Sequence, residues 1–386
     1  MTKPLPIHFT FGVGTGQSTH TPRPLNADLA LISTLGVDGY RFPISWESIS
    51  AESRAVADAA LDHYDRLTDQ LLGAGVEPMA TLYQDGSAMP QDQCDWADRS
   101  TAERFGEYAA TVAKRLADRV AYWSPLNEPN VHARTARLRP WAQIHHQLLG
   151  HARAVAALRD HNAAAIGAAN WHTPVWAASD SDASHTAADY YDVLHNRSVA
   201  DPILTGRYPE QIAEHMPVHP GDLEAINVPL DYYGVNYYAP TLVAAPAPGT
   251  GDGAPVRIQT ITGYPTTDTG TPVVPHGLHE TLVELDRRYP QLPPVHITQI
   301  GCAHERVNDT LRIQFLDHHL NAIADAIADG VAVEGYWNWS LMDWTDPVSG
   351  TQAFGLVHVD DASASHTPRA SYRWYQNRIS RHRRRR

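Results

Sequence analysis

The sequence predicts an α/β protein that folds as a single-domain (β/α)8 barrel, also called a TIM barrel. Short runs rich in β-branched and aromatic residues alternate with long stretches whose apolar residues recur at helical spacing. This alternation is typical of parallel strands covered by helices. Eight such pairs follow one another, and a length of 386 residues suits one barrel with insertions. No low-complexity linker divides the chain, so residues 1–380 are expected to form one domain.

The eight pairs can be assigned in order along the chain. The strands are expected at residues 7–13, 39–44, 77–83, 120–126, 164–170, 230–238, 296–299 and 333–340. The helices that follow them are expected at residues 25–35, 56–73, 101–119, 140–161, 184–196, 277–288, 309–329 and 372–379. The stretch 244–275 is rich in Pro, Gly and Thr, which indicates an excursion from the barrel.

Composition narrows the class of protein. The formal net charge of −13 argues against nucleic-acid binding by the body of the chain. No stretch approaches the ~20 apolar residues that would span a membrane, and the first residues do not resemble a secretory signal. Cys94 and Cys302 lie far apart and lack metal-binding spacing, which favours two reduced thiols in a cytoplasmic protein. The excess of arginine over lysine, together with many alanines, indicates a GC-rich bacterial source.

The last residues, 381–386, form a basic run. Such a run at a chain end is usually solvated, so we expect a disordered tail. Binding of an anionic partner by this tail is a weaker alternative.

The barrel prediction also locates the functional site. Catalytic residues of this fold lie at the C-terminal ends of the strands and in the loops that follow. The polar and aromatic residues at these ends are Arg41, Gln84, Glu128, Asn236, Tyr238, Gln299 and Trp339.

Glu128 is the first candidate for chemistry. It follows an apolar, aromatic strand, and Pro129 ends that strand. Burial beside such a strand disfavours the charged form and raises the pKa of a carboxyl group, as a general acid requires near neutral pH. A surface glutamate in a turn is the alternative when this segment is considered alone.

Further segments combine with this one into an ordered set. They are residues 39–46 (GYRFPISW), 81–83 (TLY), 123–129 (WSPLNEP), 201–202 (DP), 206–209 (GRYP), 231–238 (DYYGVNYY), 297–301 (ITQIG) and 335–343 (GYWNWSLMD). In sequence and in order they resemble the signatures of glycoside hydrolase family 1, the β-glucosidase and β-galactosidase family. Each match is weak alone, but the complete order makes chance similarity improbable.

The resemblance implies a role for each matched residue. Glu128 corresponds to the family's acid/base glutamate, and Gln299 stands where the family has its nucleophilic glutamate. In retaining glycosidases these two carboxyl groups are about 5–5.5 Å apart. Asn127 would bind the sugar 2-hydroxyl group. The resemblance also implies supporting roles beside the nucleophile and under the sugar ring, for Arg41, Asn236, Tyr238 and Trp339.

Several positions depart from the family pattern. After Asp343 the family usually has Asn-Phe-Glu-Trp, which grips the outer sugar hydroxyls, whereas this chain has Trp-Thr-Asp-Pro. Asp346 thus takes the place of the family's glutamate in the pocket wall, with Asp343 nearby. Strand three ends in Gln84 rather than in histidine, and the sugar-binding glutamine near strand one would be Gln17, although direct alignment places Thr19 there.

A glutamine at position 299 leaves three explanations open. It is an engineered replacement of glutamate, a natural change with hydrolysis assisted by the substrate or a bound water, or a sign that the chain transfers, rearranges or binds sugars. Glu305, just past strand seven, is a candidate substitute carboxylate. A carboxamide is neutral and a poor nucleophile, so we expect the chain to be a weak retaining glycosidase.

The predicted function is a retaining β-glycosidase-like enzyme with Glu128 as general acid/base, acting on a β-glycoside such as that of a specialised metabolite. The alternative is a non-hydrolytic barrel that binds or rearranges a sugar-bearing compound. The expected partner is a small-molecule glycoside, and no nucleic acid, membrane, cofactor or metal is expected. His145, His146 and His151 share one predicted helix without a matching carboxylate set, so structural roles are expected for them. The sequence does not indicate the oligomeric state.

Overall fold

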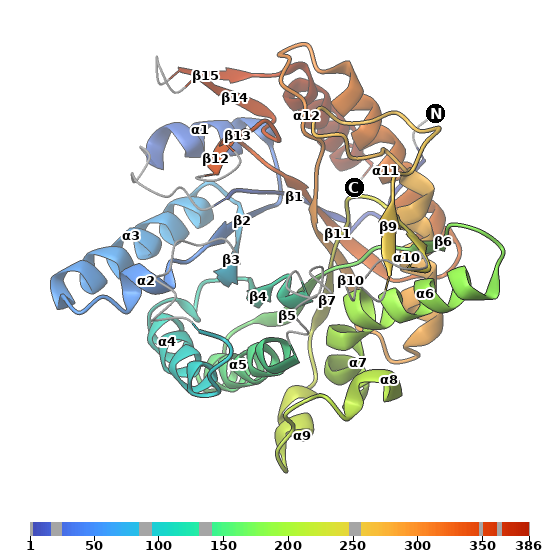
Figure 1. Ribbon diagram of the computed structural model, residues 1–386. Coiled ribbons are helices and arrows are strands. Elements are labelled where there is room, and N and C mark those ends of the chain that lie inside the picture. Colours follow the sequence, from blue (N-terminus) through green and yellow to red (C-terminus); the bar gives the residue numbers. More distant parts are fainter. Residues whose placement is uncertain are drawn as a thin grey trace.

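The computed structural model describes residues 3–16, 25–84, 95–130, 141–246, 256–346, 350–360 and 365–385. Its centre is a closed barrel of parallel strands, in the order β1-β11-β10-β7-β5-β4-β3-β2, surrounded by helices (Figure 1). The barrel strands are β1 (Thr10–Gly14), β2 (Gly39–Pro43), β3 (Glu77–Gln84), β4 (Tyr122–Asn127), β5 (Ala165–Trp171), β7 (Tyr232–Asn236), β10 (Val295–Ile300) and β11 (Val333–Trp339). The predicted single-domain (β/α)8 barrel is confirmed.

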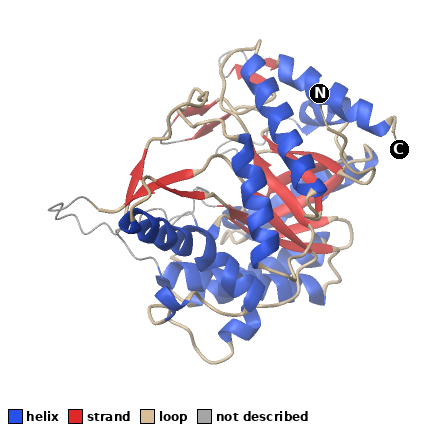
Figure 2. Ribbon diagram, turned by 90° about the vertical axis from the view of Figure 1, so that its right-hand side faces the viewer, coloured by secondary structure: helices blue, strands red, loops and turns tan. Residues whose placement is uncertain are grey.

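At least one helix follows each barrel strand and lies on the outer side of the barrel (Figure 2). The long helices are α1 (Leu25–Leu35), α3 (Arg54–Gly73), α4 (Ser100–Leu116), α5 (Trp141–Asp160), α6 (Asp182–Asp192), α10 (Pro275–Arg288), α11 (Thr310–Ala328) and α12 (Ala370–Arg383). Shorter helical segments are α2 (Trp46–Ile49), the π-helical η2 (Val193–Arg197), α7 (Ser198–Thr205), α8 (Glu210–Ala213) and α9 (Asp222–Ile226).

Helix α4 shows why these segments are helical and where they pack. Phe105, Ala109, Val112 and Leu116 recur at helical spacing, and none of the four is exposed. One face of the helix is therefore apolar and covers the barrel. Burial of each large side chain contributes about 1.5–3 kcal/mol.

Large side chains close the lower end of the barrel, which is the end opposite the C-terminal ends of the strands. Trp337, Tyr232 and Met79 form a buried cluster inside the strands. The indole of Trp337 fits only because glycines face it: an added Cβ would lie 2.3 Å from this ring at Gly12 and 2.4 Å at Gly335. The strands therefore enclose a packed floor, and polar groups gather at the opposite, C-terminal end.

Two regions add small sheets outside the barrel. Strand β6 (Val175–Ala177), β8 (Thr241–Ala244) and β9 (Arg257–Gln259) form one of them, which agrees with the predicted excursion from residue 244. The hairpins β12 (Trp344–Asp346) with β13 (Gly350–Gln352) and β14 (Val357–Asp360) with β15 (Ser365–Pro368) follow the last barrel strand.

The first strand begins later than predicted. Residues 7 and 8 form a turn, in which the Phe9 N–H donates to the carbonyl of Pro6 at 3.0 Å. Ile7 is 60% exposed, so its apolar side chain contributes little to the core. The strand therefore starts at Thr10 rather than at residue 7.

Residues 381–383 of the predicted disordered tail are helical in the structure. Helix α12 continues to Arg383 because its last turn packs against the start of the barrel. His382 is buried, and its ring makes an edge-to-face contact with Phe11 at 5.2 Å. Arg383 donates to Asp38 at 3.0 Å. Residue 386 lies outside the described residues.

Candidate active site

Six of the predicted site residues meet at the C-terminal end of the barrel. They come from the ends of β2, β4, β7 and β10, which lie around one opening. The six are Arg41, Asn127, Glu128, Asn236, Tyr238 and Gln299. Their contacts define two halves, one around Glu128 and one around Gln299.

Glu128 is held in an uncommon backbone conformation. It follows the last residue of β4 and has a φ of 55°, in the left-handed region that disfavours a non-glycine residue. Its N–H donates to the carbonyl of Ala169 at 2.8 Å. Such strained residues are often found where a side chain must project in one direction, and here the carboxylate projects toward Asn236.

Asn236 connects Glu128 to Asn127. Its Nδ2 donates to Glu128 Oε1 at 2.7 Å and to Asn127 Oδ1 at 2.9 Å. The amide orientation is fixed because the hydroxyl group of Thr298 donates to Asn236 Oδ1 at 2.7 Å. Asn236 is fully buried, whereas Glu128 is partly exposed. The hydrogen bond from Asn236 therefore anchors the Glu128 carboxylate to the barrel, and the side chain is still partly exposed.

Gln299 is oriented equally firmly. Arg41 Nη1 donates to its Oε1 at 3.0 Å, and its Nε2 donates to the hydroxyl oxygen of Tyr238 at 2.6 Å. Because a guanidinium group only donates hydrogen bonds, the amide oxygen must face Arg41 and the amide nitrogen must face Tyr238.

Arg41 is 2% exposed, and all three nitrogens of its guanidinium group donate hydrogen bonds. Nε donates to Thr81 Oγ1 at 3.0 Å, Nη1 also donates to the carbonyl of Thr298 at 3.0 Å, and Nη2 donates to Asn127 Oδ1 at 2.6 Å. Within the described part of the chain, every acceptor of this buried cation is an uncharged oxygen.

The charges of the site affect two pKa values. Burial lowers the pKa of Arg41, although the negative charge of Glu128 opposes this shift. Burial raises the pKa of Tyr238 well above its usual value, and the nearby Glu128 carboxylate adds to the effect. Tyr238 therefore remains a protonated hydroxyl group that can both donate and accept hydrogen bonds.

The other predicted residues lie around this centre or outside the described part. Trp339 is 4% exposed, and its ring lies 3.3 Å from the position of a Cβ on Gly14. Gln84 ends β3, is aligned with Asn127 across the strand pair, and is partly exposed. Asp346 ends β12 but its side chain lies outside the described residues, as does Gln17 altogether.

Two further acidic candidates do not reach the site. Asp343 is 2% exposed and binds Arg369 at 2.8 Å, so it anchors the loop instead of lining a pocket wall. Glu305 is exposed, and its N–H donates to Asp268 at 2.9 Å. Its exposure makes it unsuitable as a substitute nucleophile.

The three histidines of α5 are buried. His145 contacts Tyr208 and Asp222, each at 2.9 Å, and His146 contacts the carbonyl of Trp96 at 3.0 Å. Among the described residues, no group of three or more His, Cys, Asp or Glu side chains is placed to hold a metal ion. Likewise, no helix in the described ranges is long and apolar enough to cross a membrane.

Sequence reasoning missed the residues that support the centre. Thr81 and Thr298 fix Arg41 and Asn236, although each lies in a segment that was already singled out. Asn130 is completely buried, and its Nδ2 donates to the carbonyls of Trp171 at 2.5 Å and His195 at 2.8 Å. It therefore ties the turn after Glu128 to β5 and to η2. Only its place two residues after Glu128 could have indicated this.

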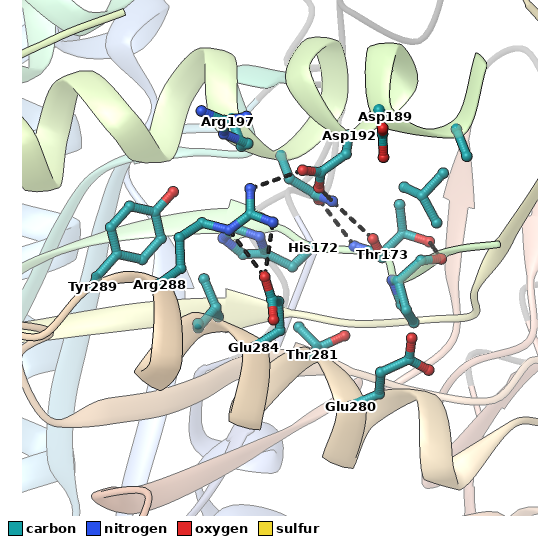
Figure 3. A pocket seen from close by; sticks show the side chains of 15 residues that line it. His172, Thr173, Asp189, Asp192, Arg197, Glu280, Thr281, Glu284, Arg288 and Tyr289 are labelled. Atoms are coloured by element: carbon teal, nitrogen blue, oxygen red, sulfur yellow. Dashed lines mark hydrogen bonds and ion pairs between the residues drawn. The ribbon is translucent and has the colours of Figure 1, made fainter. Parts of the chain in front are cut away.

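A separate cavity of about 250 Å³ lies between α6, η2 and α10, on the outer side of the barrel (Figure 3). We call it the α6–α10 crevice. It is lined by His172, Thr173, Pro174, Val175, Ala188, Asp189, Asp192, Asn196, Arg197, Glu280, Thr281, Glu284, Leu285, Arg288 and Tyr289. None of the six central residues lines it. Arg288 binds Asp192 and Glu284, each at 2.8 Å. The positive charge of this arginine is therefore already paired with carboxylates.

The same arrangement of strand ends has known counterparts. The sequence profile of Glycosyl hydrolase family 1 matches residues 20–384. The chain belongs to glycosyl hydrolase family 1. It is therefore a glycoside hydrolase, and the sequence resemblance to this family is confirmed.

Individual relatives match over nearly the whole chain. Thermostable beta-glucosidase B of Thermobispora bispora is 38% identical over 381 residues, which cover 92% of this chain and 79% of the relative. A beta-glucosidase of an Agrobacterium species is 36% identical, with 90% and 82% covered. The psychrophilic beta-glucosidase BglU of Micrococcus antarcticus has a TM-score of 0.90 at 29% identity, with 99% of this chain and 98% of that chain covered.

Proposed function

We propose that this glycoside hydrolase acts on β-glycosides, with Glu128 as its general acid/base and without a carboxylate nucleophile at position 299. The named relatives are beta-glucosidases, which favours a β-linked substrate. The observation that carries the proposal is the hydrogen-bonded chain from Glu128 through Asn236 and Asn127 to Arg41.

The contacts of Glu128 suit an acid/base group. Its Oε1 accepts a hydrogen bond from Asn236, which holds the carboxylate toward the centre of the site. Since the side chain is also partly exposed, it can reach a leaving oxygen and later a water molecule. The Arg41 charge nearby favours the carboxylate form once the proton has been delivered.

Gln299 gives the proposal its second part. The amide is neutral, and its oxygen already accepts from Arg41. It is therefore a poor candidate for attack on an anomeric carbon, and an oxocarbenium-like transition state loses its counter-charge. Loss of one such electrostatic group costs about 100-fold to 1,000-fold in rate, and loss of the covalent partner adds to this.

The substrate we favour is the β-glycoside of a specialised metabolite rather than a simple disaccharide. The support is the changed stretch after Asp343, where Trp344 packs near Gly16 instead of presenting the usual polar groups to a sugar. A Cβ on Gly16 would lie 3.4 Å from the Trp344 ring and 3.6 Å from the Trp339 ring. The partly exposed Trp344 indole suits an apolar or aromatic aglycone.

The test compares three chains on a panel of aryl β-glycosides: the unsubstituted chain with Gln299, Gln299→Glu and Gln299→Glu with Glu128→Gln. We expect very slow turnover by the first chain and a rate at least about 1,000-fold higher for the second. The third should lose most of that gain, above all for poor leaving groups that need protonation. Inactivity of Gln299→Glu on every sugar tested, in a folded protein, would refute the proposal. A non-hydrolytic binding role would instead leave ligand affinity unchanged by Glu128→Gln.

A further inference from the structure

Strand β10 loses its regular register at Thr298. Against β7, Ile297 is aligned with Val235, and Gln299 is aligned with Asn236. Thr298 is therefore an extra residue in this pairing, and the register with β11 shifts in the same stretch. Successive side chains of a regular strand point to opposite faces, whereas a β-bulge changes their direction. As a result, both Thr298 and Gln299 reach the centre at the barrel mouth.

The backbone of β7 makes room for the Thr298 side chain at Gly234. A Cβ at this glycine would lie 2.9 Å from both Cγ2 and Oγ1 of Thr298, and 2.6 Å from the carbonyl oxygen of Ala168. Thr298 is 1% exposed, and its hydroxyl group donates to Asn236 Oδ1 at 2.7 Å. The bulge and the glycine therefore hold this hydroxyl group in one position.

The hydrogen bonds of the centre fix the orientation of Asn236 from two sides. Arg41 can only donate, and its Nη2 donates to Asn127 Oδ1 at 2.6 Å. The same oxygen accepts from Asn236 Nδ2 at 2.9 Å, and this nitrogen also donates to Glu128 Oε1 at 2.7 Å. The Asn236 oxygen therefore faces Thr298, whose hydroxyl group donates to it. Arg41 determines one end of this chain of hydrogen bonds, and Thr298 anchors the other.

The orientation of Asn236 affects how readily Glu128 gives up its proton. An N–H group directed at a carboxyl group favours the ionised form, whereas a carbonyl oxygen in its place would favour the protonated form. Asn236 is fully buried, so loss of the Thr298 hydroxyl group would remove a donor from a buried oxygen. Such a group is costly to leave unsatisfied, and the amide would tilt toward another donor. Its hydrogen bond to Glu128 would then weaken.

We propose that Thr298 is a positioning residue for proton transfer: it holds Asn236 as a hydrogen-bond donor and thereby sets the acid strength of Glu128. The inference rests on the proposed function, in which Glu128 protonates the leaving oxygen. Thr298 does not transfer the proton itself, and it acts on Glu128 only through Asn236. Without its hydroxyl group, Glu128 becomes a weaker acid, and substrates whose leaving group needs a proton react more slowly.

The other groups around Glu128 stay the same when Thr298 is changed. The positive charge of Arg41 and the hydroxyl group of Tyr238 interact electrostatically with Glu128. Around the same opening, the described strand ends and η2 contribute Gln84 on β3, Gln299 on β10 and, behind Trp171, His195. Because Gln299 is uncharged, β10 adds no second carboxylate to the titration of Glu128. A difference between Thr298 variants therefore reports on the Thr298 hydroxyl group.

A direct titration tests the inference without catalysis. The unsubstituted chain, Thr298→Val and Thr298→Ser are labelled with 13C at the glutamate carboxyl carbons and titrated by NMR. The Glu128 signal is assigned by its absence in Glu128→Gln. Thr298→Val keeps the shape of the side chain but lacks the hydroxyl group, so the titration midpoint of Glu128 should rise by about 0.5 to 1 pH unit. Thr298→Ser keeps the donor and should restore the original midpoint.

Kinetics in the Gln299→Glu background test the consequence for catalysis. Adding Thr298→Val should lower kcat/KM about threefold to tenfold for aryl β-glucosides with poor leaving groups. The loss should stay below about twofold for 2,4-dinitrophenol, which leaves without protonation. The decline of kcat/KM at alkaline pH should also move to higher pH. Thr81→Val is the matched control, because it removes an equally buried hydroxyl group that contacts Arg41 instead of Asn236. Its effect should be similar for all leaving groups.

The outcomes separate this inference from the proposed function. If Gln299→Glu hydrolyses β-glycosides, but Thr298→Val changes neither the Glu128 midpoint nor the dependence on the leaving group, Thr298 serves only the fold and the proposed function stands. If the midpoint rises but no variant cleaves any glycoside, the effect of Thr298 on Glu128 is supported and the proposed function fails. Thr298→Ala replaces Thr298→Val if the latter does not fold. Misfolding of both variants, with Thr298→Ser folded, would overturn the inference.

Discussion

The barrel mouth and the α6–α10 crevice each contain a buried or partly buried arginine, but the two arginines have different partners. Arg288 in the crevice binds the carboxylates of Asp192 and Glu284. Although burial alone would lower its pKa, these charges raise it. Arg41 at the barrel mouth has only uncharged described acceptors, and burial lowers its pKa.

The comparison distinguishes the paired charges around Arg288 from the charge of Arg41, which is held by neutral groups. Where opposite charges are already paired, their interaction serves the fold and little is left for a ligand. Where a buried charge is held by neutral dipoles, the protein keeps a strong field directed at whatever enters. The α6–α10 crevice, although it is a cavity of about 250 Å³, is therefore less informative about chemistry than the barrel mouth. The following changes should distinguish the two regions.

The largest expected difference concerns the two arginines in the Gln299→Glu background. Arg41→Met should lower kcat/KM for an aryl β-glycoside by about 100-fold to 1,000-fold, because position 299 and Asn127 both lose a charged donor. Arg288→Met should leave kcat/KM unchanged. Steady-state kinetics check this, with circular dichroism to verify folding. Equal losses in both variants would mean that the crevice also supports catalysis.

The second prediction concerns acid stability, in which the crevice takes part through His172. Burial lowers the pKa of His172 and His151 to about 4 and of His319 to about 3. The folded protein therefore binds fewer protons than the unfolded chain below pH 6.5, so stability is complete above this pH and falls as pH decreases toward 4. Each histidine removes about 1.4 kcal/mol per pH unit within this window.

Denaturant melts between pH 7 and pH 4 measure this loss. The pKa of His151 is lowered by burial alone. In a folded His151→Gln variant, the free energy of unfolding should therefore depend on pH less steeply, by the uptake of about one proton. A free energy of unfolding that is flat across the window would contradict the prediction.

The third prediction concerns Asn130, which lies between the two regions. Asn130→Ala leaves the carbonyls of Trp171 and His195 without their donor and should cost about 1–3 kcal/mol. It should also lower the rate of the Gln299→Glu chain, because the turn after Glu128 loosens. Asn196→Ala is the control: it removes contacts to Thr173 and Asp192 in the crevice but should change stability alone. A rate loss in the control as large as in Asn130→Ala would refute this division.

The smallest effect is expected from the crevice ion pairs themselves. Arg288 and Asp192 are partly exposed, so their pairing should contribute about 1 kcal/mol or less. A double-mutant cycle with Arg288→Met and Asp192→Asn, followed by urea unfolding, measures the coupling. A much larger coupling energy would show that the crevice is electrostatically closed to solvent.

The sequence predicted the barrel because the spacing of apolar residues marks the helices, and runs of β-branched and aromatic residues mark the strands between them. It also brought the six central residues together, since parallel strands place their C-terminal ends at one opening. Their chemical roles remain predictions. Thr298 illustrates the limit within the centre: its neighbour was singled out, but its hydrogen bond to Asn236 depends on the register of β10 with β7.

Long-range packing accounts for what the sequence did not predict. A basic run at a chain end normally indicates disorder, but His382 finds a contact with Phe11 that is nearly the whole chain away. Asp343 pairs with Arg369, and Asp192 pairs with Arg288, across distant segments, so Asp343 appeared to be a pocket residue. Such pairings follow from tertiary packing, which local patterns do not encode.

The closed floor of the barrel also restricts the order of events. Trp337, Tyr232 and Met79 fill the lower end, and Gly12 and Gly335 let the indole seat without a gap. A molecule bound above this floor has to enter and leave through the mouth alone. The glycoside and both products of its cleavage therefore share one route. Product release and entry of the next glycoside would then compete for this one opening, a limit set by a tryptophan at the opposite end of the barrel.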